Sequence, residues 1–179
     1  GDHRDLHSFP TRRSPIFRYD MRRNIYLDFS YLLVLSATLG GVLVLGTLVA
    51  PVVFHNSSLG MEVFVDKHNA GIMMAEIFHR FSYWLYFVSF YVLAYELYMY
   101  KMGQRDTYVF VGATLVSFSA LMFSAVYAPK ILSMQSLGRE ATQSDTFLSV
   151  HMASEIDFKI LAVGLLLLFI RRLMLMRTR

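Results

Sequence analysis

Cysteine is absent from this chain of 179 residues. Its absence excludes a disulfide framework and any metal site built on thiolates. Charge is also scarce: 17% of the residues are charged, whereas a soluble domain carries about 25%. The charged residues are bunched between long apolar blocks. This pattern is typical of a protein that crosses a membrane several times.

Sequence motifs for catalysis are lacking as well. We find no phosphate-binding loop, no nucleophile elbow and no pair of catalytic acids, so we expect no enzyme. The formal net charge of +4 could suggest nucleic acid as a partner. The basic residues, however, lie beside the apolar blocks, where membrane topology explains them better. We therefore expect the lipid bilayer as a partner and no nucleic acid.

The first residues differ from the rest of the chain. Residues 1–16 resemble a translated sequencing adapter, and they contain no apolar region of a signal peptide. We therefore expect residues 1–20 to be a non-native extension, with the native chain beginning at Met21. Residues 21–179 then form one domain, and an adapter of this kind favours a microbial source.

Four apolar stretches predict an all-α membrane protein, a four-helix transmembrane bundle. The expected spans are 29–54, 72–100, 107–129 and 156–176. The last is the weakest, because only residues 160–170 are free of charge; Arg171 and Arg172 would extend to the interface. Pro51 is expected to kink or end the first helix, and Pro129 closes the third span.

Lysine and arginine predict the orientation of the spans. They gather at Arg22 and Arg23, in the short turn between the second and third spans, and in the C-terminal tail. The positive-inside rule then places both termini in the cytoplasm. We expect a multi-pass protein of the bacterial inner membrane, and a homo-oligomer remains an open possibility.

An internal repeat relates the two halves of the chain. Ala50-Pro51 matches Ala128-Pro129, and the polar motifs that follow match at offsets of 78 or 79 residues. These motifs are Ser-Leu-Gly-x-Glu at 58–62 and 136–140, and Met-x-x-Glu-Ile-x-x-Arg/Lys at 73–80 and 152–159. The matches predict a helical hairpin that occurs twice in tandem.

The run GGVLVLGTLVAPVVF at 40–54 and the run MMAEIFHRFSYW at 73–84 resemble a known family. It is the bacterial domain-of-unknown-function family numbered 4149, related to eukaryotic transmembrane protein 205. The resemblance extends over most of residues 31–176. It implies a four-helix membrane protein and no particular biochemical activity.

Ionisable residues near the outer ends of the second and fourth spans are the candidate site. The set is Glu76, His79, Arg80, Glu155 and Lys159. One interpretation is a polar vestibule that opens outward and serves small solutes, ions or the assembly of partners. The alternatives are ion pairs within each helix, at i,i+4 spacing, and contacts between copies of the chain.

A metal site is the second functional hypothesis. Glu76 and His79 have the i,i+3 spacing of carboxylate-bridged metal sites in helix bundles. Together with His151 and Glu155 they could hold a transition metal ion in a redox-linked membrane protein. Haem is disfavoured, because the repeat alignment places His79 and His151 about 10 Å apart along the helix axis. The leading interpretation therefore includes no cofactor.

Overall fold

The computed structural model describes residues 25–54 and 66–177, and their regular structure is helical throughout. The all-α fold class is therefore confirmed, while the predicted extension at 1–20 and the first Ser-Leu-Gly-x-Glu copy lie outside the described residues. The elements are α1 (Ile25–Val44), η1 (Leu45–Val49), α2 (Ala50–Phe54), α3 (Lys67–Lys101), α4 (Thr107–Met122), η3 (Phe123–Tyr127), α5 (Ala128–Ser136), α6 (Arg139–Thr142) and α7 (Asp145–Arg177).

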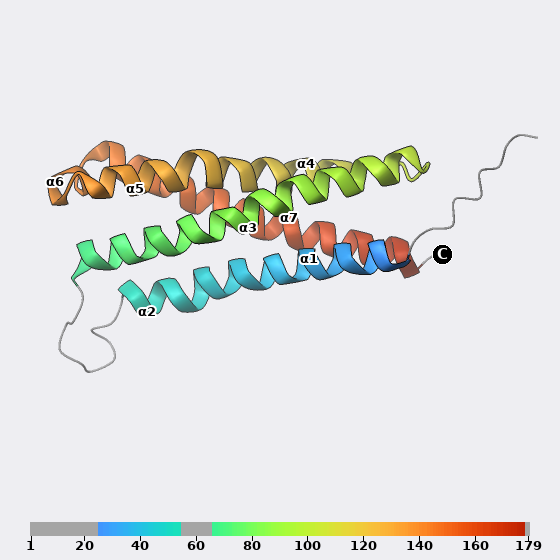
Figure 1. Cartoon of the computed structure of the whole chain (residues 1–179), viewed down its shortest axis with the longest axis horizontal. Helices are drawn as coiled ribbons and strands as arrows, with labels where there is room; N and C mark the ends of the chain where they lie inside the picture. The colour runs from blue at the N-terminus through green and yellow to red at the C-terminus, as the bar shows by residue number, and fades with distance from the viewer. Residues whose placement is uncertain (1–24, 55–65, 178–179) are drawn as a thin grey trace, which may run out of the picture.

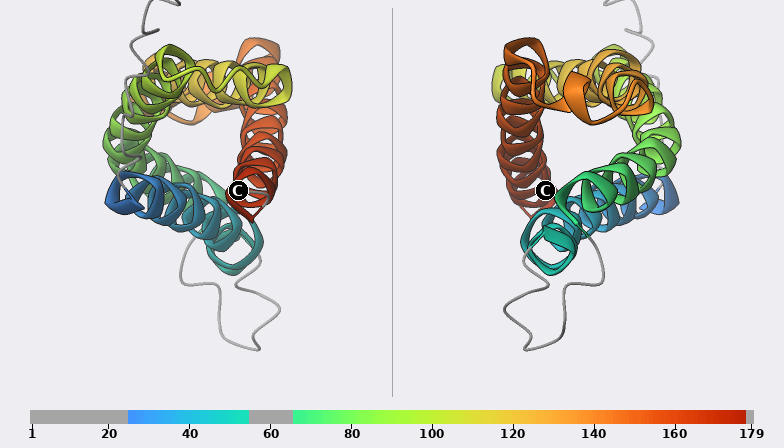
Figure 2. Two further views of the ribbon diagram at one scale, coloured as in Figure 1. Left: turned by 90° about the vertical axis from the view of Figure 1, so that its right-hand side faces the viewer. Right: turned by 90° about the vertical axis from the view of Figure 1, so that its left-hand side faces the viewer.

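Long helical rods form the body of the molecule (Figure 1). The segment α1–η1–α2 is one rod, α4–η3–α5 is another, and α3 and α7 are rods by themselves. Seen end on, the rods stand at the corners of a square (Figure 2). α1 and α4 each pack against both α3 and α7, so α3 and α7 lie diagonally opposite each other.

Two of the rods begin earlier than the sequence predicted. α3 begins at Lys67 rather than near residue 72, and α7 begins at Asp145 rather than near residue 156. Both helices start with polar turns that an apolar run does not include. Asp66 caps α3 by accepting a hydrogen bond from the Asn69 N–H at 2.9 Å, which is why the helix can start there.

Neither helix ends at its proline. The first helix continues through Pro51 to Phe54, and the third continues through Pro129 to Ser136. Each proline follows a π-helical turn, in which the N–H of the preceding alanine bonds to the carbonyl five residues back. The wide turn accommodates a residue that cannot donate a hydrogen bond and would clash with the carbonyl four residues back.

These π turns lie 78 residues apart, at 45–49 and 123–127, which is also the spacing of the Ala-Pro pairs. The same local device therefore recurs at matching places in the two halves. This agrees with the predicted hairpin repeat, which stays a prediction.

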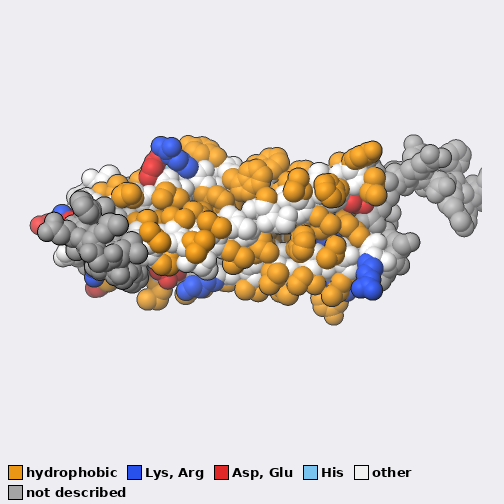
Figure 3. All heavy atoms as spheres, turned by 90° about the horizontal axis from the view of Figure 1, so that it is seen from below, with side chains coloured by type: hydrophobic (Ala, Val, Ile, Leu, Met, Phe, Trp, Pro, Cys, Tyr) orange, Lys and Arg blue, Asp and Glu red, His pale blue; other side chains and the backbone are white. Residues whose placement is uncertain are grey.

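The surface of the bundle is apolar as well as its core. Leu33, Phe90, Phe118 and Leu167, one from each rod, are each more than half exposed. Figure 3 shows one face on which apolar side chains cover the middle, with charged side chains toward the ends. By length and hydropathy, Ile25–Phe54 and Thr107–Ser136 are candidate membrane spans. The fold therefore has the character of a membrane protein.

Candidate functional site

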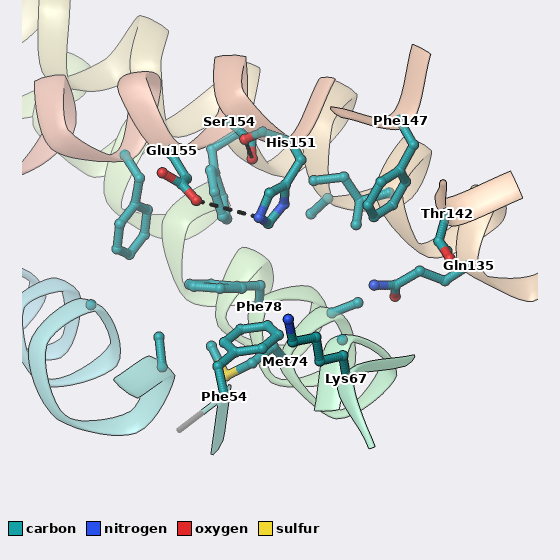
Figure 4. A pocket seen from close by; sticks show the side chains of 18 of the residues that line it. Phe54, Lys67, Met74, Phe78, Gln135, Thr142, Phe147, His151, Ser154 and Glu155 are labelled. Carbon is teal, nitrogen blue, oxygen red and sulfur yellow. Dashed lines mark hydrogen bonds and ion pairs between the residues drawn. The ribbon is translucent and has the colours of Figure 1, made fainter. Parts of the chain in front are cut away.

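A pocket of about 820 Å³ lies at the end of the bundle formed by α2, α5 and α6. All of the long rods contribute to its wall, including both π turns through Gly46, Thr47 and Phe123. Figure 4 shows aromatic side chains, among them Phe54, Phe78 and Phe147, and polar side chains, among them His151 and Glu155, around the space. A volume of this size is within the range of pockets that bind small molecules.

Three phenylalanines form the floor of the pocket. Phe78, Phe123 and Phe158 come from three different rods, and their ring centroids lie 5.0–5.4 Å apart. Edge-on and tilted contacts of this kind stabilise aromatic clusters beyond simple burial. The cluster separates the pocket from the closely packed middle of the bundle, where Leu85, Leu161 and the other core side chains meet.

Charged groups surround the rim. Arg139 of α6 forms an ion pair with Asp66, which ties α6 to the start of α3. The Asn69 N–H, assisted by Arg139, holds the pKa of the Asp66 carboxyl below its usual range. On α7, Glu155 accepts contacts from His151 at 3.3 Å and Lys159 at 3.7 Å. Lys67 forms no ion pair within the described part of the chain.

The structure divides the predicted vestibule residues into two groups. Glu155 and Lys159 line the pocket, whereas Glu76, His79 and Arg80 do not. Glu76 instead bonds to Arg80 at 2.7 Å on the exposed surface of α3. Both i,i+4 ion pairs within a helix are therefore present, and of the predicted set only Glu155 and Lys159 line this pocket.

Helical geometry explains this division. The pocket face of α3 is the stripe of Gly71, Met74, Ala75 and Phe78, and Glu76 is about 200° around the helix from Phe78. On α7 the pocket stripe includes His151, Ser154, Glu155 and Phe158. In the repeat alignment, the α3 stripe corresponds to α7 positions one residue before the α7 stripe. The two equivalent glutamates, Glu76 and Glu155, therefore point in different directions.

The predicted metal ligands do not gather either. His151 and Glu155 are neighbours, but Glu76 is paired with Arg80, and the His79 ring packs against Tyr83. Among residues 25–54 and 66–177, no group of three or more such ligands is close enough to hold a metal ion.

A second polar cluster lies inside the opposite end of the bundle, and sequence reasoning missed it. Glu96 of α3 and Arg172 of α7 form a bidentate ion pair, 6% and 2% exposed respectively. Tyr31 donates a hydrogen bond to Glu96 at 2.6 Å, and Gln104 accepts one from Arg172 at 3.1 Å. The pair crosses the diagonal of the square and joins three rods to the turn before α4.

Aromatic rings complete this cluster. Tyr95 stacks on Tyr31 with centroids 3.8 Å apart and donates a hydrogen bond to Asp28. The Arg172 guanidinium lies 5.3 Å from the Tyr95 ring centroid, a cation–π distance. Arg172 was expected to extend to the membrane interface, and that expectation is wrong because a buried carboxylate faces it from α3. The available signal was a tyrosine close in sequence to an acid on each of the first two helices: Tyr31 three residues after Asp28, and Tyr95 next to Glu96.

Two more acids have roles that the sequence did not indicate. Asp106 caps α4 through the Val109 N–H at 3.0 Å and pairs with Arg171 at 2.6 Å. Asp157 of α7 accepts a hydrogen bond from the buried Ser119 hydroxyl of α4 at 2.5 Å. Both contacts join α4 to α7, so this helix pairing carries two polar ties.

Comparison with known proteins gives one match. A family model described as a domain of unknown function (DUF4149) matches residues 33–140, from α1 to α6. No curated protein and no solved structure matches the chain.

We predict that the Glu96–Arg172 pair is strongly coupled. Arg172→Met alone leaves a buried carboxylate without its cation and should reduce the free energy of unfolding by about 3–5 kcal/mol. The double variant Glu96→Met/Arg172→Met removes both charges and should lose less than the sum of the single changes. Thermal unfolding in detergent measures this cycle. As a control, the same substitutions in the exposed pair Glu76–Arg80 should change stability by less than about 1 kcal/mol. Additive losses at Glu96 and Arg172 would contradict the prediction.

A second prediction concerns pH. The hydrogen bond from Arg171, with those from the Val109 and Tyr108 N–H groups, lowers the pKa of Asp106. A lowered pKa gives stability that is present at neutral pH and is lost as the pH falls below about 4, the ordinary value for aspartate. Asp106→Asn keeps a helix cap but not the charge. The melting temperatures of wild type and variant should therefore differ at pH 7 and converge toward pH 3; a constant difference would refute this cause.

Proposed function

The chain belongs to the DUF4149 family, whose description names no activity, and we propose that it is a four-span, non-enzymatic membrane protein that binds a small, largely apolar molecule in the pocket. The observation that carries this proposal is the pocket itself: a space of about 820 Å³ with an aromatic floor, apolar walls and a charged rim. Sites for small molecules combine an apolar lining with a few polar groups in this way.

The exposed apolar side chains support four spans. Phe90 of α3 is 64% exposed and Leu167 of α7 is 59% exposed, although these helices carry more charge than the other two rods. A water-soluble bundle would turn such residues inward and polar residues outward. Here Ser89, Ser117 and Ser119 are buried inside instead. Lipid around all four rods accounts for both features.

Basic residues at the end of the bundle away from the pocket support the orientation. Lys101 and Arg105 lie at the end of the bundle that holds the Glu96–Arg172 pair, together with Arg177 of α7. The positive-inside rule assigns this end to the cytoplasm of a bacterial cell. In the proposed arrangement the pocket is near the outer surface of the inner membrane, and both termini are inside.

The absence of cysteine allows a clean test of this topology. Single cysteines at Leu137, which is 77% exposed beside α6, and at Thr107, exposed at the start of α4, are the only thiols in their variants. In intact cells a membrane-impermeant maleimide should label Leu137→Cys and not Thr107→Cys. After lysis both should react. Labelling of both positions, or of Thr107→Cys alone, in intact cells would overturn the proposed orientation.

Filling the pocket tests the binding function. Ala50 of α2 lines the pocket, whereas Val52, two residues further on, is 58% exposed and does not. Ala50→Phe should reduce retention of a neutral amphiphile, glycerol monolaurate, several-fold in native mass spectrometry from a non-ionic detergent. Val52→Phe adds a similar ring outside the pocket and should bind like wild type. Equal retention by both variants would rule out the pocket as the binding site.

A further inference from the structure

We propose that the ligand is an anionic amphiphile of the surrounding membrane, with its apolar chain above the phenylalanine floor and its anionic group at Lys67. This inference rests on the proposed binding function and names the class of ligand. It follows from three features of the pocket: where the pocket opens, how its charges are balanced and how its polar and apolar parts are arranged along the bundle.

The pocket opens on the side of the bundle between α1–α2 and α7. Leu43 and Phe54 line it and are 48% and 38% exposed, and Lys159 on α7 lines it with a side chain that is 74% exposed. Residues that face both the pocket and the outside mark its mouth. Toward the middle of the bundle, α1 packs against α7. Its continuation α2 packs against α3 instead, so the mouth lies where this rod leaves α7. In the proposed membrane arrangement this mouth faces lipid, so an apolar chain can enter without passing through water.

Charge balance at the rim favours an anion. Each acid that lines the pocket already has a cation: Asp66 has Arg139, and Glu155 has Lys159 and His151. Lys67 is left without a carboxylate among the described residues. Figure 4 draws its amine beside the Phe54 ring, among the side chains that line the pocket. A carboxylate or phosphate group there would gain a charged hydrogen bond, whereas a cation would be repelled.

The arrangement along the bundle matches an amphiphile. Lys67 and Phe78 are eleven residues apart on α3, a rise of about 16 Å. Between them Gly71, Met74 and Ala75 present small or apolar groups to the pocket. A molecule with its charge at Lys67 would therefore place an extended apolar chain toward the floor. The charged end then lies toward the membrane surface and the chain lies deeper, as for a lipid in the bilayer.

A binding comparison in a non-ionic detergent tests the inference. The probes are laurate and phosphatidylglycerol as anionic amphiphiles, glycerol monolaurate as the neutral partner of laurate, and inorganic phosphate as a free anion. Native mass spectrometry measures bound probe. Wild type should bind laurate about tenfold more tightly than glycerol monolaurate, the effect of one charged hydrogen bond. Lys67→Gln should abolish the preference. Arg80→Gln, which removes a cation from the same helix outside the pocket, should keep it.

Other outcomes either overturn a defined part of the argument or restrict the ligand. Equal binding of laurate and glycerol monolaurate, or a preference that survives Lys67→Gln, would refute anion selection while the pocket could still bind apolar molecules. Inorganic phosphate binding that depends on Lys67 and excludes laurate would show a free-anion site. Binding of all probes that is unchanged by Ala50→Phe would refute the pocket function itself. Phosphatidylglycerol binding alone, lost in Lys67→Gln, would support the inference and restrict the ligand to a phospholipid.

Discussion

The ion pair between Glu96 and Arg172 is the constraint on which the rest of the bundle depends. Charges removed from water cost several kcal/mol each unless they are paired and hydrogen-bonded, so neither side chain can be buried without the other. The pair links α3 to α7 across the diagonal, and Tyr31 adds α1 to the same cluster. Separating the rods at this end would expose unpaired charge to an apolar interior, which keeps the end closed.

The pocket lies at the other end of the bundle, where the interior is open. Among residues 25–54 and 66–177, no ion pair crosses the diagonal there. α3 and α7 meet through Phe78 and Phe158, and beyond these rings the described side chains leave an open space. Within lipid, helices gain little from burying apolar surface against each other, so packing and polar ties decide where they touch. The tie at this end, Asp66–Arg139, lies on the rim and leaves the interior accessible.

Composition and apolar runs were sufficient to predict the helical class and the short turn before α4, because both depend on local patterns. They were insufficient for Arg172, since an arginine near the end of a span has the same sequence pattern whether it extends to the interface or pairs with a buried acid. The third helix also runs beyond its expected span of 107–129, to Ser136, whereas the first ends at Phe54, the last residue of its expected span. A proline normally removes one helical hydrogen bond, and only the wider π turn lets the helix continue.

The predicted repeat shows the same limit for the site. It aligns Glu76 with Glu155, and each of these glutamates forms an i,i+4 ion pair. Sequence similarity does not specify rotation about the helix axis, however, and a displacement of one residue turns a helix face by about 100°. Glu155 faces the pocket and Glu76 faces outward for this reason. Two hairpins of similar sequence can therefore enclose an asymmetric pocket, and its charged rim need not have a counterpart in each half.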